Sequence, residues 1–144
     1  MAIITLCTLL LSQCHKDRLC TVQMATCIDV ATEAAGAGID PALAISLGWY
    51  ETRLRPGLTS RVGAKGPLQA IPRFWCKTTP CDYVEAGLRA LKHYLKKEPN
   101  KQMAICRYNA GTCNPRSWDW AAGVIKLSKS IREAPTLQHP QSEQ

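Results

Sequence analysis

Apolar side chains recur along most of the chain with a period of about 3.6 residues, which is typical of amphipathic helices. We expect helices at residues 20–35, 40–53, 82–97, 101–110 and 118–131, and a shorter one at 67–75 that is interrupted at Pro72. Four of them have a predicted capping residue, namely Asp40, Asp82, Asn100 and Ser117. The first helix is expected to bury Val22, Ala25, Ile28 and Ala31. Residues 56–65 contain proline and glycine and predict a loop.

The helix at 40–53 places a carboxyl group on its apolar face. Asp40 can accept hydrogen bonds from the first-turn N–H groups, and Pro41 suits the first helical position. Counted from Leu43, the helical period brings Leu47, Glu51 and Leu54 onto one stripe. Burial raises the pKa of a carboxyl group, so Glu51 is a candidate proton donor near neutral pH. The alternative is a glutamate that turns outward, or pairs with Arg53 or Arg55.

Three short motifs follow one another in the sequence. They are Glu51-Thr52, then Gly63-Ala64-Lys65-Gly66-Pro67-Leu68-Gln69 with Pro72, then Tyr108-Asn109-Ala110-Gly111. Together they resemble the motifs of the lytic transglycosylase domain of the soluble lytic transglycosylase type, over roughly residues 39–111. Thr52 stands where that family usually has serine, and Pro67 where it usually has leucine. Threonine keeps the hydroxyl group, and proline suits the start of a new helix.

The resemblance implies a fold and a reaction. The fold would be an all-α domain of the α+β lysozyme-like superfamily, goose-type, with a substrate cleft. The reaction would cut the β-1,4 bond between N-acetylmuramic acid and N-acetylglucosamine in peptidoglycan, with Glu51 as acid and then base. The muramoyl 6-hydroxyl would attack its own anomeric carbon and form a 1,6-anhydro sugar, so no cofactor is implied. In the sequence Glu51 has no nearby carboxylate, the next being Asp82 and Glu85, which suits an internal nucleophile.

Other site residues are implied by their place in the motifs. Gln69, Tyr108, Asn109 and Ser60, or Thr59 in place of Ser60, would bind the glycan. For Gln69 the alternative is a bond to loop backbone, and for Tyr108 and Asn109 it is a helix end without a further role. Tryptophans can stack on sugar rings, but core positions are expected for at least two of Trp75, Trp118 and Trp120.

The length of 144 residues suits one domain with a single core. We expect a domain at 15–134 and a polar, disordered tail at 135–144. Residues 1–14 are apolar and uncharged, which favours a signal segment. The alternative is a buried first helix of the domain. No apolar run reaches the ~18 residues expected of a membrane-spanning helix.

Cysteine usage indicates an oxidising compartment, either periplasmic or extracellular. Six cysteines follow the first segment, namely Cys20, Cys27, Cys76, Cys81, Cys106 and Cys113. Cys76 with Cys81, and Cys106 with Cys113, are near enough to bridge across turns. On a continuous helix Cys20 and Cys27 would lie about 10.5 Å apart, beyond the reach of a disulfide, so they pair elsewhere or the helix is broken. No C-x-x-C motif is present and the histidines (His15, His93 and His139) are scattered, so no metal site is expected.

The net charge is +7, and six of the 18 basic residues fall between Arg53 and Lys77. Such a basic segment suits an anionic polymer, which can be peptidoglycan or nucleic acid. The cysteines and the lack of a recognition motif argue against nucleic acid. We therefore expect a monomer that acts on glycan strands, in a secretion, conjugation, wall-remodelling or phage setting that the sequence does not specify.

Three other functions stay open at this point. A muramidase of the same fold would hydrolyse the bond. A non-catalytic glycan-binding or secretion-accessory protein would bind wall material without turnover. A disulfide-rich structural module would share the motifs by chance.

Overall fold

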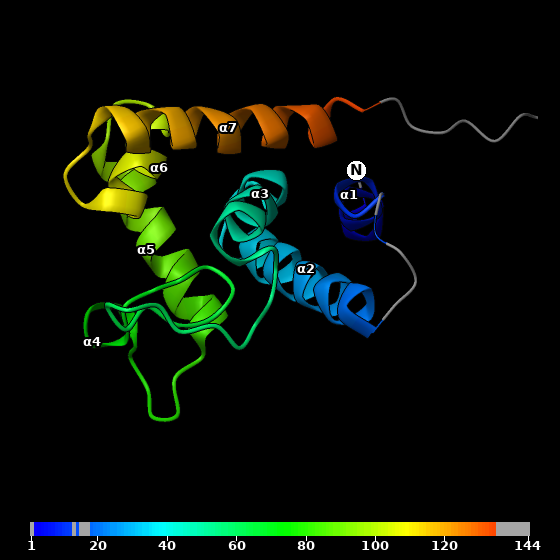
Figure 1. Ribbon diagram of the computed structural model, residues 1–144, viewed down its shortest axis with the longest axis horizontal. Coiled ribbons are helices and arrows are strands. Elements are labelled where there is room, and N and C mark those ends of the chain that lie inside the picture. The colour runs from blue at the N-terminus through cyan, green and yellow to red at the C-terminus, as the bar shows by residue number, and fades with distance from the viewer. Residues whose placement is uncertain (1, 13, 15–17, 135–144) are drawn as a thin grey trace, which may run out of the picture.

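The computed structural model describes residues 2–12, 14 and 18–134, and the predicted tail at 135–144 lies outside them. The regular elements of this part are all helices, which confirms the all-α class at this level (Figure 1). They are α1 (Ile3–Leu10), α2 (Arg18–Gly36), α3 (Pro41–Thr52), α4 (Pro72–Trp75), α5 (Tyr83–Lys97), α6 (Lys101–Ala110) and α7 (Pro115–Arg132). Within the described ranges, β pairing is limited to isolated bridges in the loop between α3 and α4.

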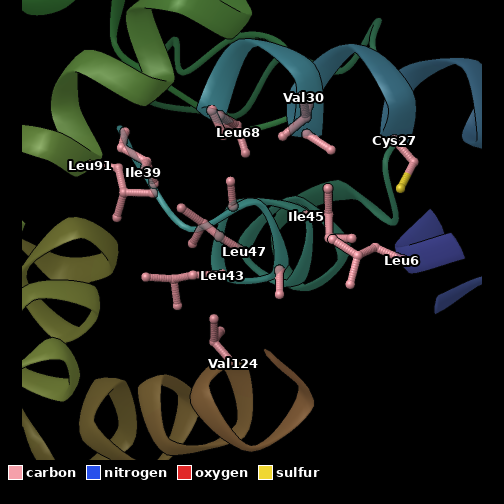
Figure 2. Close-up of a cluster of buried hydrophobic side chains, with 14 of the residues drawn as sticks. Leu6, Cys27, Val30, Ile39, Leu43, Ile45, Leu47, Leu68, Leu91 and Val124 are labelled. Atoms are coloured by element: carbon pink, nitrogen blue, oxygen red, sulfur yellow. The ribbon is translucent and has the colours of Figure 1, made fainter. Parts of the chain in front are cut away.

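Helix α3 is the centre of the fold. It is apolar on every side, and a helix of that kind has to be buried. It packs against α1, α2 and α7. Figure 2 shows Leu43, Ile45 and Leu47 of α3 between Val30 of α2 and Val124 of α7. Packing of α3 in the core therefore fixes the positions of the residues at its two ends.

Asp40 fixes the start of α3 as predicted. Its Oδ1 accepts a hydrogen bond from the Ala42 N–H at 3.0 Å, and Pro41 is the first helical residue. Its Oδ2 is ion-paired with Arg132, near the C-terminal end of α7. One carboxylate thus caps α3 and ties it to α7.

The predicted caps of α5 and α6 are confirmed, and that of α7 is wrong. Asp82 accepts from the Glu85 N–H at 3.1 Å, and Asn100 accepts from the Met103 N–H at 2.8 Å. Helix α7 begins earlier than predicted, because Asn114 accepts from the Ser117 N–H at 2.9 Å and Pro115 takes the first helical position. Ser117 is a buried residue of the first turn.

Two further predictions need correction. Helix α2 buries Ala31 as expected, together with Cys27, Val30 and Ala34, whereas Val22 and Ala25 are exposed. The buried face of α2 is the one that packs against α1 and α3. The alanine-rich sequence of α2 does not indicate which face that is. Pro67 does not start a helix: residues 66–69 form a turn, and the helix begins at Pro72. Gly66 and Gln69 have positive φ angles of 81° and 56°, which a right-handed helix does not accommodate.

All eight cysteines form disulfides. The two predicted bridges, Cys76–Cys81 and Cys106–Cys113, are present. The two cysteines of the first segment, Cys7 and Cys14, pair with Cys27 and Cys20 respectively. Residues 3–10 form helix α1, which packs against α2, α3 and α7, and the signal segment stays a prediction. Four disulfides are typical of exported proteins, and none of the described helices is both long and apolar enough to cross a membrane.

Candidate functional site

Glu51 lies in the last turn of α3, one residue before the helix ends. Because the helix is enclosed by the core, the carboxyl group is largely withdrawn from water. This burial raises the pKa of Glu51 from 4.5 to about 8. At neutral pH the side chain is therefore mostly protonated and can donate a hydrogen ion.

The turn after Glu51 is held in an uncommon conformation. Arg53 and Leu54 both have positive φ angles, of 57° and 58°. The Leu54 N–H donates to the Gly48 carbonyl oxygen at 3.2 Å, which folds the chain back over the helix end. A Cβ atom on Gly48 would lie 2.7 Å from a methyl group of Leu54, so a larger residue there would push the Leu54 side chain aside. Gln23 of α2 secures the turn, since its Nε2 donates to the Arg53 carbonyl oxygen at 2.9 Å.

A second segment, the turn at 66–69, is joined to the same helix end. The Thr52 hydroxyl lies 2.9 Å from the Pro67 carbonyl oxygen and donates to it. Lys65 and Ala70 close the turn by exchanging backbone hydrogen bonds of 2.9 and 3.2 Å. Gly66 packs against Tyr83, where an added Cβ would lie 2.6 Å from the tyrosine Cβ. The turn is thus fixed beside Glu51 by contacts with both α3 and α5.

Tyr108 of α6 is the third part of the site. Its hydroxyl donates to the Leu68 carbonyl oxygen at 2.5 Å. Burial raises its pKa well above the ordinary value, and the charges of Glu51 and Tyr94 raise it further. Thr52, the residue after Glu51, and Tyr108 are bonded to adjacent residues of the same turn. The end of α3, the turn at 66–69 and the end of α6 therefore meet at one place.

The remaining predicted site residues have local roles in the structure. The Gln69 Nε2 donates to the carbonyl oxygens of Leu58 and Gly66 at 3.0 and 2.9 Å, so its amide nitrogen is bonded to loop backbone. Only its carbonyl oxygen is left to accept from a ligand. The Ser60 Oγ accepts from the Ala64 N–H at 3.1 Å and holds the preceding bend of the loop. Asn109 is exposed, next to the last residue of α6.

The expectation that at least two of three tryptophans are buried is wrong. Trp118 is exposed, and Trp75 and Trp120 are only partly buried. The core is filled instead by leucine, isoleucine, valine and alanine, so these rings remain at the periphery. Trp120 meets the ring of Tyr50 edge to face at a centroid distance of 5.9 Å.

The other acidic groups act away from Glu51. Asp82 and Glu85, together with Asp29, add to the effect of burial in raising the pKa of Glu33. The cause that raises the pKa of Glu51 is desolvation. Across the residues that the structure describes, no group of three or more His, Cys, Asp and Glu side chains is placed to hold a metal ion.

Two hollows of the described chain lie away from Glu51. One, of about 500 Å³, is lined by residues of α1, α3 and α7 that include Leu10, Trp49 and Ile131. Another, of about 300 Å³, lies between α2 and α5 and includes Glu33 and Lys92. Neither includes Glu51, Leu68 or Tyr108, so the predicted substrate cleft at Glu51 stays a prediction.

Sequence reasoning missed two groups that shape the site. Gln23 is a buried amide in α2, and its spacing from Cys27 and Val30 was the available signal that it faces the core. Tyr94 contacts Tyr108 at a ring centroid distance of 6.3 Å, and only its position on the flank of an amphipathic helix hinted at this.

No protein-family model matches the chain, and a search of curated proteins found no match. The functional argument therefore rests on the geometry of the site. That geometry offers one protonated carboxyl group in a desolvated position, next to a rigid backbone turn and a tyrosine. Such a group can act as a general acid and, after giving up its proton, as a general base.

Proposed function

We propose that this protein is a lytic transglycosylase of lysozyme-like fold that cuts peptidoglycan, with Glu51 as its catalytic acid and base. The observation that carries the proposal is the pKa of Glu51, which burial raises to about 8. The hydrogen bonds that join Thr52, next to Glu51, and Tyr108 to the turn at 66–69 support it. These are the three segments on which the resemblance to lytic transglycosylases rests.

The proposed reaction depends on the transfer of one proton from Glu51 and back to it. Protonated Glu51 gives its proton to the glycosidic oxygen between N-acetylmuramic acid and N-acetylglucosamine, and the bond from that oxygen to the anomeric carbon breaks. The anomeric carbon gains oxocarbenium-like character. The muramoyl 6-hydroxyl oxygen then bonds to that carbon, and its proton passes to the Glu51 carboxylate. The products are a 1,6-anhydromuramoyl end and a free 4-hydroxyl, and Glu51 is protonated again.

The distribution of acidic groups favours this reaction over hydrolysis. An inverting hydrolase needs a second carboxylate roughly 6.5–9.5 Å from the acid, to activate water. The two carboxylates that follow Glu51 in the sequence, Asp82 and Glu85, help to raise the pKa of Glu33, whereas burial raises the pKa of Glu51. An internal hydroxyl nucleophile needs no such partner.

The surface and the disulfides suit a wall substrate. Five basic side chains between the end of α3 and α5 are exposed, namely Arg53, Arg55, Arg61, Arg73 and Lys77. They favour a polymer with carboxylate groups, such as glycan strands with lactyl and peptide substituents. With four disulfides, the proposed location is periplasmic or extracellular.

The test is digestion of purified peptidoglycan followed by mass spectrometry of the fragments. The wild-type protein should release anhydro-ended fragments, one water lighter than the products of hydrolysis. Glu51→Gln should release none while still binding the wall, and Glu133→Gln, at an exposed glutamate after α7, should behave as wild type. Reducing ends would instead show a muramidase. Binding without any products from the wild type would show a glycan-binding protein.

A further inference from the structure

A row of aromatic rings leads away from the candidate site. Tyr94 contacts Tyr108 at a centroid distance of 6.3 Å, and it also contacts His93 and Trp75 at 5.1 and 6.2 Å. His93 and Trp75 contact each other at 5.4 Å. The rings come from α4, α5 and α6, which follow one another along one side of the molecule (Figure 1). The row therefore begins at the tyrosine beside Glu51 and extends toward α4.

This row is not part of the core. His93 is exposed, and Trp75 and Tyr94 are partly buried. The rings are nevertheless held in place. Arg89 of α5 donates to the Trp75 carbonyl oxygen, and the Cys76–Cys81 disulfide follows directly after Trp75. A fixed and partly exposed set of rings is suited to binding, because little conformational entropy is lost when a ligand covers it.

Charge around the row indicates what kind of ligand it suits. Arg73 and Lys77 flank Trp75 in the sequence and are exposed. Lys96 and Lys97, also exposed, lie one helical turn after His93 on α5, and residues at this spacing share a helix face. Aromatic faces suit the apolar faces of sugar rings, and the cations suit carboxylates. A glycan bearing carboxylate groups combines both features.

We propose that Trp75, His93 and Tyr94 form a second binding surface, which holds sugars of the same glycan strand at a distance from the bond that Glu51 cleaves. This rests on the proposed function and adds to it a preference for long strands. Under this proposal, a short fragment that spans only the cleaved bond gains no binding energy from Trp75 or His93. Binding energy from the remote sugars would then be available only to polymeric substrate.

The test measures binding without turnover, in a protein that already carries Glu51→Gln. Trp75→Ala and His93→Ala are added separately, and affinity is measured by calorimetry for long glycan strands and for short fragments. Each should weaken binding of long strands about fivefold to tenfold and leave short fragments unchanged within about twofold. Phe74→Ala is the matched control, because Phe74 is 62% exposed, neighbours Trp75 and lies outside the row. It should bind as the Glu51→Gln parent.

The possible failures can be told apart. If Glu51→Gln binds long strands and both added variants bind them equally well, the second surface is disproved while the proposed function stands. If Glu51→Gln and wild type bind no glycan at all, both proposals fail together. Thermal unfolding of each variant checks the fold, and Trp75→Phe, which keeps a ring, should recover part of the lost affinity. A loss that appears equally with short fragments would also overturn the proposal.

Discussion

The hydroxyl group of Tyr108 donates a 2.5 Å hydrogen bond to the carbonyl oxygen of Leu68, 40 positions earlier in the chain. Leu68 is fully buried, so its carbonyl group has little access to water as a substitute partner. This bond connects α6 to the turn at 66–69, and the bond made by Thr52 connects α3 to the same turn. Each of the following predictions tests one support of this site.

Tyr108→Phe removes the donor and leaves the Leu68 carbonyl oxygen without it. An unsatisfied buried acceptor costs about 1–3 kcal/mol, so the free energy of unfolding should fall by that amount. Urea denaturation followed by circular dichroism measures it. Tyr94→Phe, which removes a hydroxyl group that makes no hydrogen bond within the described residues, should change stability by less than about 0.5 kcal/mol. Equal losses in the two variants would contradict a specific role for the Tyr108 hydroxyl.

Thr52→Val keeps the shape of a fully enclosed side chain and removes its hydroxyl group. The Pro67 carbonyl oxygen then loses its donor, and we expect a loss of about 1–3 kcal/mol. Amide hydrogen exchange should increase at the backbone of the turn at 66–69 more than in α2. Thr52→Ser, which restores the hydroxyl, should recover most of the stability. Slow exchange at the turn in the valine variant would show that other contacts hold it.

Glu51→Gln should change how stability depends on pH. A carboxyl group with a raised pKa in the folded state holds its proton more tightly there than in the unfolded chain. Wild-type stability should therefore fall as pH rises from about 4.5 to about 8, by at most about 5 kcal/mol at about 1.4 kcal/mol per unit. The glutamine variant lacks this loss and should be the more stable protein at pH 9, with a much smaller difference at pH 4.

Unfolding curves at the two pH values provide the measurement. Glu133→Gln, at an exposed glutamate, should show the same difference from wild type at both. If the gain from Glu51→Gln were equal at pH 4 and pH 9, the carboxyl group would not be buried as the structure has it.

The rate of glycan cleavage should fall above pH 8. The general acid must carry its proton at the start of the reaction, and burial raises the pKa of Glu51 to about 8. On the alkaline side, kcat/KM should decrease about tenfold for each further pH unit. Release of soluble fragments from peptidoglycan, with buffers of constant ionic strength, gives the profile. An activity that continues to rise up to pH 10 would exclude Glu51 as the acid.

Gly87→Ala should destabilise the protein although alanine is the better helix former. An added Cβ would lie 2.5 Å from the Leu68 Cβ, so α5 and the turn at 66–69 would have to separate. We expect a loss of about 1–3 kcal/mol by chemical denaturation. Gly36→Ala, at the end of α2 with open space around the new methyl group, should be neutral or stabilising by up to about 1 kcal/mol. A stabilised Gly87→Ala variant would show that the turn moves freely.

The sequence predicted what depends on neighbouring residues. Asp40, Asp82 and Asn100 act as caps because their side chains reach N–H groups two or three positions ahead. The helical period alone placed Glu51 toward the core. The prediction that Ser117 caps α7 was wrong, because Asn114 caps the helix and Pro115 is its first residue.

Contacts between distant segments were beyond such reasoning. The pairing of Cys7 with Cys27 depends on where α1 packs, and no spacing rule gives that position. The buried face of α2 depends in the same way on its neighbours. The turn at 66–69 was mistaken for a helix start because Pro67 fits both structures, and only the positive φ of Gly66 and Gln69 separates them. The role of Glu51 as catalyst, and the lysozyme-like fold, stay predictions.

Thr52 and Tyr108 both donate hydrogen bonds to peptide oxygens of the turn. Every type of amino acid supplies the same peptide oxygen. Position 67 can therefore vary among distant relatives while the turn next to Glu51 keeps its shape. Relatives are then better found by two features than by the residue types of the turn. One is a hydroxyl residue directly after a glutamate at the end of a helix, and the other is a tyrosine shortly before the glycine that ends a helix.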